Sequence, residues 1–82
     1  MAYISTGRKF AAIKSRSSIE QGLKRRDISG AELAKMAGTT RATISNIRRG
    51  HTRRVYTETA RRIEIILGAD PGDLFDYDEV AS

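Results

Sequence analysis

Residues 29–50, SGAELAKMAGTTRATISNIRRG, carry the strongest structural pattern in the chain and predict two short helices joined by a tight turn. Ser29 is placed to cap the first helix, and Glu32 three positions later completes a capping box. Gly38 follows this helix at a position where a positive φ costs glycine little. The first helix is expected to turn an apolar stripe toward the core, formed by Leu33, Met36 and Ala37. Ala34 is small and allows another helix to approach closely.

The second helix of this pair has little to bury. Thr40 is placed to cap it and Gly50 to end it, and its apolar stripe consists of Ile44 and Ile47 alone. Small and hydrogen-bonding side chains are left on the outward side, namely Arg41, Ala42, Ser45, Asn46 and Arg49. A helix of this kind is suited to lie in a groove of DNA.

This segment resembles the helix-turn-helix of the phage repressor/Cro family of DNA-binding proteins. The small, turn and buried positions of that motif correspond to Ala34, Gly38, Ile44 and Ile47. The runs GTTR at 38–41 and RRG at 48–50 are similar to the lambdoid repressors in particular. The similarity continues through Leu67-Gly68 and Asp73-Leu74-Phe75, so that it covers about residues 18–76. An αα-hairpin that merely contains a glycine turn would not meet so many spaced constraints at once.

The fold expected from the pattern and the resemblance is all-α, a compact five-helix bundle, with a sixth helix if residues 8–14 also fold. We expect no strand. Residues 1–17 are predicted to form an N-terminal basic arm with a short helix over 8–14 that buries Phe10 and Ile13. Residues 18–76 form the helix-turn-helix DNA-binding domain, and residues 77–82 an acidic flexible tail.

Two further helices of the domain are expected from capping signals and apolar spacing. Ser17 and Glu20 form a second capping-box signature, which predicts a helix through about Arg26. Thr57 is placed to cap a helix through Leu67, followed by Gly68. The positions expected to face the core are Ile19, Leu23, Ile28, Ala60, Ile63, Ile66 and Leu67.

A last short helix is expected to start at Asp70-Pro71, because proline at the first helical position lacks an N–H that would have no partner anyway. Leu74 and Phe75 are expected to pack back on the bundle. They are also, with Tyr77 and Val80, the alternative candidates for a dimer surface.

Charge is distributed unevenly along the 82 residues. All 15 Lys and Arg lie at or before Arg62, whereas five of the ten acidic residues follow Gly68. A basic body favours a polyanion partner, because binding releases condensed counterions. The chain has no cysteine, which excludes disulfides and thiolate metal sites and is compatible with a reducing cytosol. No stretch approaches the ~20 apolar residues of a membrane helix.

The residues predicted to read bases lie on the second helix of the pair, as the resemblance implies for its first turn. Arg41 can donate two hydrogen bonds to guanine, and Asn46 can read an adenine edge. Ala42 is small enough to meet a thymine methyl, and Ser45 can bond to a base or a phosphate; a passive surface role is an equal alternative for both.

Phosphate contacts are predicted around this helix. The N–H groups near Gly30 form a partially positive helix end, and Thr40 either binds phosphate or only caps its helix. The basic edge that follows the helix consists of Arg49, His51, Thr52, Arg53 and Arg54. The N-terminal arm adds Arg8, Lys9, Lys14 and Arg16, which either contact DNA or belong to a disordered segment.

Two positions depart from the family pattern. Relatives usually place at the start of this helix pair a glutamine that touches phosphate, and here the residue is Gly30. Many relatives also pair an arginine of the preceding helix with a glutamate near the end of the recognition helix, and here those positions hold Leu23 and Arg48. Arg48 is therefore expected either to find Glu20 or Asp27 or to join the phosphate-binding edge.

Enzyme chemistry is not indicated. His51 is the only histidine and lies among arginines, with no nearby carboxylate to orient it. The acidic residues cluster in the tail, where they make no convincing metal site, and there is no phosphate-cradling glycine loop. We expect no cofactor, no metal, no small-molecule ligand and no membrane partner.

The function implied is sequence-specific binding of double-stranded DNA by a transcriptional regulator, a repressor, with residues of about 41–49 in the major groove. The resemblance implies a homodimer on a near-palindromic operator. It also implies a bacterial or phage-encoded protein that is located in the cytoplasm and is associated with the nucleoid when bound to DNA. The alternative is an antitoxin whose acidic tail binds a basic toxin and which represses its own operon. A third possibility is the DNA-binding part of a longer regulator.

Overall fold

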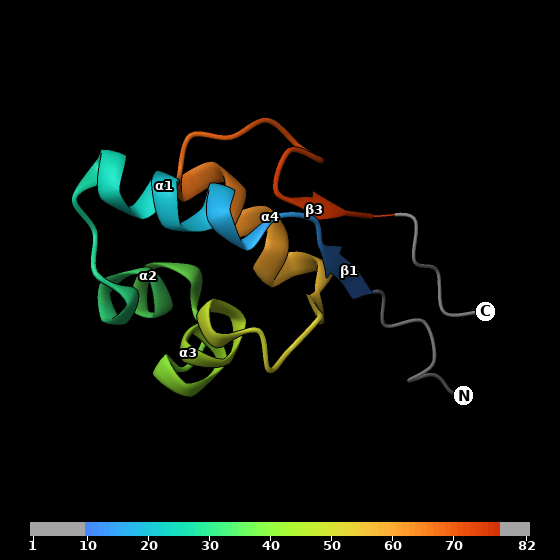
Figure 1. Cartoon of the computed structure of the whole chain (residues 1–82), viewed down its shortest axis with the longest axis horizontal. Coiled ribbons are helices and arrows are strands. Elements are labelled where there is room, and N and C mark those ends of the chain that lie inside the picture. Colours follow the sequence, from blue (N-terminus) through green and yellow to red (C-terminus); the bar gives the residue numbers. More distant parts are fainter. Residues whose placement is uncertain (1–9, 78–82) are drawn as a thin grey trace.

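The computed structural model describes residues 10–77, which form four helices and a small sheet (Figure 1). In chain order the elements are β1 (Phe10–Ile13), α1 (Arg16–Arg26), α2 (Gly30–Ala37), α3 (Arg41–Arg49), β2 (Arg54–Tyr56), α4 (Thr57–Ile66) and β3 (Phe75–Asp76). The three strands are antiparallel in the order β2-β1-β3. The domain is mostly helical, as predicted, but the expectations of five helices and of no strand are wrong.

The pair α2 and α3 forms as the sequence predicts. The Ser29 hydroxyl accepts a hydrogen bond from the Glu32 backbone N–H, and the Glu32 carboxylate accepts one from the Ser29 N–H, which completes the capping box. Gly38 and Gly50 end the two helices with φ of 72° and 80°, a region that favours glycine. The local sequence therefore specifies both ends of each helix.

The N-terminal arm with a short helix is a wrong prediction over the described residues. Phe10–Ile13 is the central strand of the sheet, with Ala11 opposite Val55 and Ile13 opposite Phe75. Its partners lie more than 40 residues away in the chain, so a four-residue helical pattern could not reveal them. Residues 10–17 are thus part of the folded domain, because α1 also begins within them, at Arg16.

Two helix starts also differ from the prediction. Ser15, not Ser17, caps α1, and its hydroxyl accepts a hydrogen bond from the Ser18 N–H. Helix α4 begins directly from β2 with Tyr56 at the N-cap position and no side-chain cap, so Thr57 is its first residue. The chain passes from β2 into α4 without an intervening loop.

The helix expected from Asp70 is absent. A turn forms instead, in which the Asp73 N–H donates to the Asp70 carbonyl and the Asp73 carboxylate accepts from the Asp70 N–H. The chain then continues into β3. Leu74 and Phe75 are 5% and 0% exposed, so they pack in the core of the monomer rather than offering a dimer surface. Tyr77 is half-buried, and Val80 lies outside the described residues.

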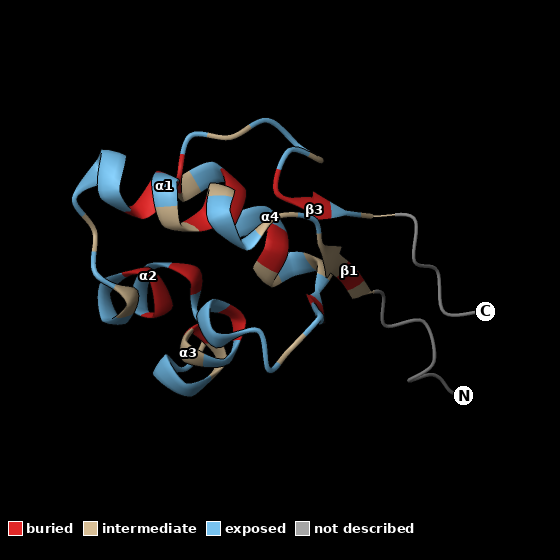
Figure 2. Ribbon diagram, in the orientation of Figure 1, coloured by how far each residue is buried: buried red, intermediate tan, exposed pale blue. Residues whose placement is uncertain are grey.

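The core lies between the four helices and the inner face of the sheet (Figure 2). Its buried members include most of the positions expected from the sequence, and the described core is Ala11, Ile19, Leu23, Leu33, Ala34, Ala37, Ile44, Ile47, Val55, Ala60, Ile63, Leu67, Leu74 and Phe75. Ile13, Ile28 and Ile66 are half-buried against it. Met36 is the exception, since 57% of it is exposed on the outer side of α2.

One buried charged residue holds the C-terminal segment to α4. The Glu64 Oε2 accepts hydrogen bonds from the backbone N–H groups of Gly72, Leu74 and Phe75, at 3.1, 3.0 and 3.2 Å. Its Oε1 accepts one from the Tyr77 hydroxyl at 2.7 Å. Glu64 is 2% exposed, and these four donors stabilise its buried carboxylate.

Tyr77 makes the stability of this segment sensitive to alkali. Burial, and then the Glu64 carboxylate, raise the pKa of the Tyr77 hydroxyl above its usual value. Because the folded-state pKa is the higher one, this contribution is complete below about pH 10 and is lost as the pH rises further. We expect Tyr77→Phe to lose less stability than the wild type between about pH 8 and pH 11, measured by urea denaturation at each pH. An equal loss in both proteins would contradict this assignment.

Candidate nucleic-acid interface

Helix α3 turns one face inward and the other to solvent. Ile44 and Ile47 are 2% and 1% exposed and fix the inward face against the core. The four predicted base-reading residues lie on the other side, where Arg41, Ala42 and Asn46 are exposed and Ser45 is half-buried. The helix is nine residues long and carries no acidic residue, so its outward face is neutral or positive throughout.

Thr40 acts as the cap of α3. Its hydroxyl oxygen accepts a hydrogen bond from the Thr43 N–H at 3.1 Å and lies 2.9 Å from the Thr43 hydroxyl oxygen. Of the two roles expected for Thr40, capping is therefore confirmed. A phosphate contact from its exposed side chain remains a prediction.

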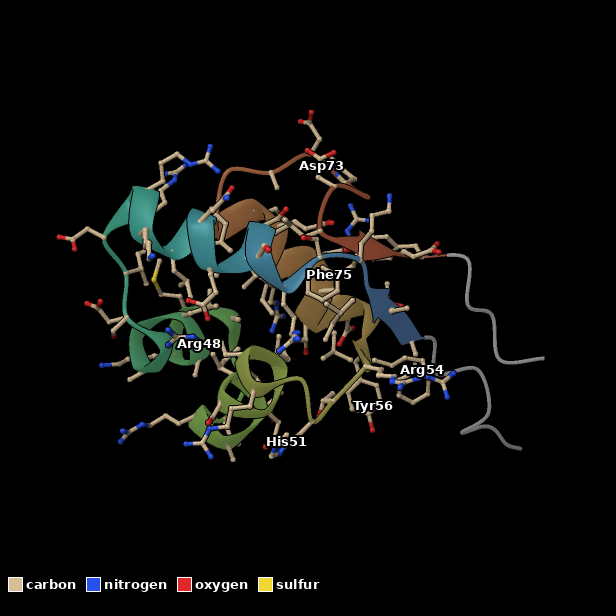
Figure 3. The ribbon with its side chains drawn as sticks, in the orientation of Figure 1. Arg48, His51, Arg54, Tyr56, Asp73 and Phe75 are labelled. Carbon is tan, nitrogen blue, oxygen red and sulfur yellow. The ribbon has the colours of Figure 1, made fainter. Side chains whose placement is uncertain are left out.

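The basic loop after α3 is fixed at both ends. The backbone N–H groups of His51 and Thr52 donate to the Asn46 carbonyl at 2.9 and 3.3 Å, and the Arg53 carbonyl accepts from the Ile13 N–H at 2.8 Å. The His51 side chain is exposed at the outer side of this loop (Figure 3). Arg49 and Arg53 are exposed too, and Thr52 is half-buried. Their side chains are thus carried by a backbone attached to α3 and β1.

Arg54 lies farther along, on strand β2. Its guanidinium carbon is 5.7 Å from the centre of the Phe10 ring, a cation–π contact, and Phe10 in turn stacks on Tyr56 with ring centres 5.1 Å apart. Figure 3 shows Arg54 and Tyr56 together beside β1. The contact with Phe10 holds Arg54 on the outer face of the sheet, whereas Arg53 belongs to the loop.

An ion pair joins α1 to the last turn of α3. Arg48 Nε and Nη2 donate to the two carboxylate oxygens of Glu20 at 2.6 and 3.1 Å. This hydrogen-bonded contact lowers the pKa of Glu20 and raises that of Arg48. The side chains of Arg48 and Glu20 are 40% and 34% exposed, respectively. Solvent therefore screens the ion pair, which adds about 1 kcal/mol of stability or less. The partner of Arg48 is therefore Glu20 rather than Asp27, which occupies the C-cap of α1.

Gly30 is the first residue of α2 and lies beneath Arg48. A Cβ added at Gly30 would be 2.8 Å from Arg48 Nη1. A groove of about 700 Å³ separates the start of α2 from α3, and its lining is shared between the two helices: Ser29, Gly30, Ala31, Arg41, Ala42, Ile44, Ser45, Arg48 and Arg49, with Glu20 from α1. The predicted phosphate-binding end of α2 therefore shares one groove with three of the four predicted base-reading residues, Arg41, Ala42 and Ser45.

The four residues predicted as arm contacts separate into two groups. Arg8 and Lys9 lie outside the described residues. Lys14 Nζ donates to the Gly72 carbonyl at 2.9 Å, and Arg16 Nη1 donates to the Arg48 carbonyl at 3.4 Å. Arg16 and Glu20 are one turn apart on α1 and both contact Arg48, one at its backbone and one at its side chain. Their i, i+4 spacing places both side chains on the same face of α1.

Other kinds of site find little support in the described part of the chain. Residues 10–77 contain no cluster of three histidine, aspartate or glutamate side chains arranged to hold a metal ion. Among the same residues no helix has the length and hydrophobicity needed to cross a membrane. The candidate site in these residues is therefore the groove between α2 and α3 with the basic residues around it.

Comparison with known proteins agrees with this geometry. Residues 18–79 match the family model of the Cro/C1-type HTH DNA-binding domain. Domains of this family bind DNA and are typically not enzymes. The match does not favour the antitoxin alternative. No curated protein and no solved structure matches the chain significantly. Because the matched segment spans most of the chain and contains both helices of the motif, the protein belongs to the Cro/C1-type helix-turn-helix family of DNA-binding domains.

Proposed function

We propose that this protein is a sequence-specific regulator of transcription, a repressor, that places α3 in the major groove of double-stranded DNA. The observation that carries the proposal is the outward face of α3. Arg41, Ala42, Ser45 and Asn46 lie on the side opposite to the buried Ile44 and Ile47. Arginine and asparagine are suited to guanine and adenine edges, and alanine to the thymine methyl group.

The phosphate contacts in this proposal flank α3 at both ends. The cap residue Thr40 lies at the N-terminal end of α3, and the loop with His51, Thr52 and Arg53 follows its C-terminal end. The start of α2 at Gly30 lies alongside α3, next to Arg48. Arg49 and Arg54 complete the set of proposed phosphate ligands. Because this loop is hydrogen-bonded to α3 and β1, the backbone that carries its side chains keeps a fixed position relative to the helix.

The protein acts as a homodimer in this proposal, at least on DNA. A dimer presents two copies of α3, which must sit about 34 Å apart to reach one face of a near-palindromic site. Selection of bound duplexes from a random pool tests the proposal, since it yields the base preferences, the symmetry and the half-site spacing. Sedimentation of the chain with and without the selected duplex then gives the stoichiometry. Failure to enrich any sequence would contradict sequence-specific binding.

Arg53 is expected to contribute through phosphate rather than through bases. Arg53→Ala should weaken binding almost equally on all duplexes and reduce the slope of log K against log salt by about one unit. Fluorescence anisotropy across a salt series measures both quantities. A loss confined to one selected sequence would instead assign Arg53 to base or minor-groove recognition.

A further inference from the structure

The ion pair with Glu20 uses only part of the Arg48 guanidinium. Nε and Nη2 donate to the two carboxylate oxygens, at 2.6 and 3.1 Å, which fixes the plane of the group. The third nitrogen, Nη1, has two further N–H donors. Among the described residues, no group accepts a hydrogen bond from Nη1. The arginine is therefore oriented by one partner and still able to bind another.

Nη1 of Arg48 lies beside Gly30, and both residues line the groove between α2 and α3. It would lie 2.8 Å from a Cβ at position 30, so the absence of a side chain at Gly30 leaves room for it. The same groove is lined by Arg41, Ala42 and Ser45 of the outward face of α3. Figure 3 shows Arg48 between α1 and the two helices of the motif. A duplex seated against α3 would thus pass the mouth of this groove.

On the basis of the proposed DNA binding, we infer that Arg48 binds a DNA phosphate through Nη1, with Glu20 and Gly30 as positioning residues. The two roles expected for Arg48, pairing with α1 and binding phosphate, are then performed together by different edges of one guanidinium. Lysine could not replace it, because an ammonium group is a single point of charge without a planar fork.

A second contact keeps the backbone of Arg48 in place. Arg16 Nη1 donates to the Arg48 carbonyl at 3.4 Å, from one turn before Glu20 on α1. The guanidinium of Arg16 also packs against Gly50, where an added Cβ would lie 2.8 Å from Nη1. Helix α1 therefore contacts both the backbone and the side chain of the same residue. Arg48 is therefore held in place by α1 as well as by its own helix.

The positioning role of Glu20 predicts a change in DNA affinity opposite to the one expected from charge alone. Glu20→Gln removes a negative charge close to the DNA-facing groove, so a simple charge effect would strengthen binding. If Glu20 orients Arg48, the substitution replaces one of the two acceptor oxygens by an NH2 group, loosens the guanidinium and weakens binding instead. We expect a loss of about threefold or more in affinity, with the fold unchanged by circular dichroism.

The central measurement is the salt dependence of DNA binding by Arg48→Met. The probes are a duplex selected from a random pool and a random-sequence duplex of equal length. One lost phosphate contact lowers the salt slope by about 0.9, so the deficit relative to the wild type shrinks about threefold between about 50 and 200 mM salt. Arg25→Met is the matched control, because this exposed arginine of α1 lines a different hollow, with Gly22 and Leu67. Its slope should equal that of the wild type.

Gly30→Ala tests the steric part of the inference. The new methyl group meets Nη1 and should lower affinity in the wild-type background. In the Arg48→Met background the same change should have no further effect, because the group with which it collides is gone. Equal losses in both backgrounds would overturn the positioning role of Gly30.

The outcomes separate this inference from the proposed function. If the wild type binds neither duplex, the proposed function fails. If the wild type binds and Arg48→Met retains its salt slope, or if Glu20→Gln binds more tightly, DNA binding stands and the phosphate role of Arg48 is wrong. A purely structural ion pair would give equal losses for Arg48→Met and Glu20→Gln with the wild-type slope.

Discussion

Glu64→Ala is expected to unfold most of the protein at 25 °C. The substitution leaves three backbone N–H groups and the Tyr77 hydroxyl without the acceptor that now binds them. An unsatisfied buried donor costs about 1–3 kcal/mol, so the loss of the acceptor for all four donors is expected to cost about 4 kcal/mol or more. A core of this size leaves only about 3–5 kcal/mol of net stability. Urea denaturation followed by circular dichroism at 222 nm measures the change.

Two variants make this experiment specific to the buried carboxylate. Glu64→Gln keeps an oxygen for the three N–H groups, and its amide can donate to the Tyr77 hydroxyl, so we expect a loss of about 1 kcal/mol. Glu58→Ala removes an exposed carboxylate from the first turn of the same helix and should cost about 0.3–1 kcal/mol. An unfolding midpoint of Glu64→Ala close to that of the wild type would contradict the role assigned to Glu64.

Arg41→Ala is expected to have the largest effect on DNA specificity. Arg41 is the first residue of α3 and is exposed at the groove shared with α2. Loss of a bidentate contact to one base costs about 1–3 kcal/mol on the preferred duplex and relaxes the preference at one position in each half-site. Competition binding with duplexes that carry single base changes measures both effects.

The control for Arg41→Ala is Arg25→Ala, which removes the same charge from α1 on another surface. We expect this control to keep the wild-type preferences. If Arg41→Ala loses the same factor on every duplex, its side chain contacts phosphate, and the base preference at that position comes from elsewhere on α3.

Local sequence was sufficient for the helix-turn-helix. The caps Ser29 and Thr40 and the glycines Gly38 and Gly50 act within a few residues of their own helix ends, so a short segment contains all the information needed to place them. The burial of Ile44 and Ile47 followed from their spacing, and it fixed which side chains of α3 face outward. The family and the DNA-binding class were predictable for the same reason, since the motif is a local pattern.

The ion pair at the end of α3 was only partly predictable. The sequence left Arg48 with Glu20, Asp27 or phosphate as partners, because all three are compatible with a charge near the end of that helix. The packing of α1 against α3 brings Glu20 to the guanidinium and Arg16 to the carbonyl of the same residue. The choice depends on the relative placement of two helices, which no local pattern encodes.

The sequence by itself determined the helix pair, its caps and turn, the basic character of the surface and the residues that α3 exposes. The tertiary structure alone decided that Phe10–Ile13 is a strand, that the segment after Asp70 is a turn and β3, and that Glu64 is buried. These features depend on pairing and hydrogen bonding between residues far apart in the chain. Such contacts outweigh the weak conformational preferences of short segments.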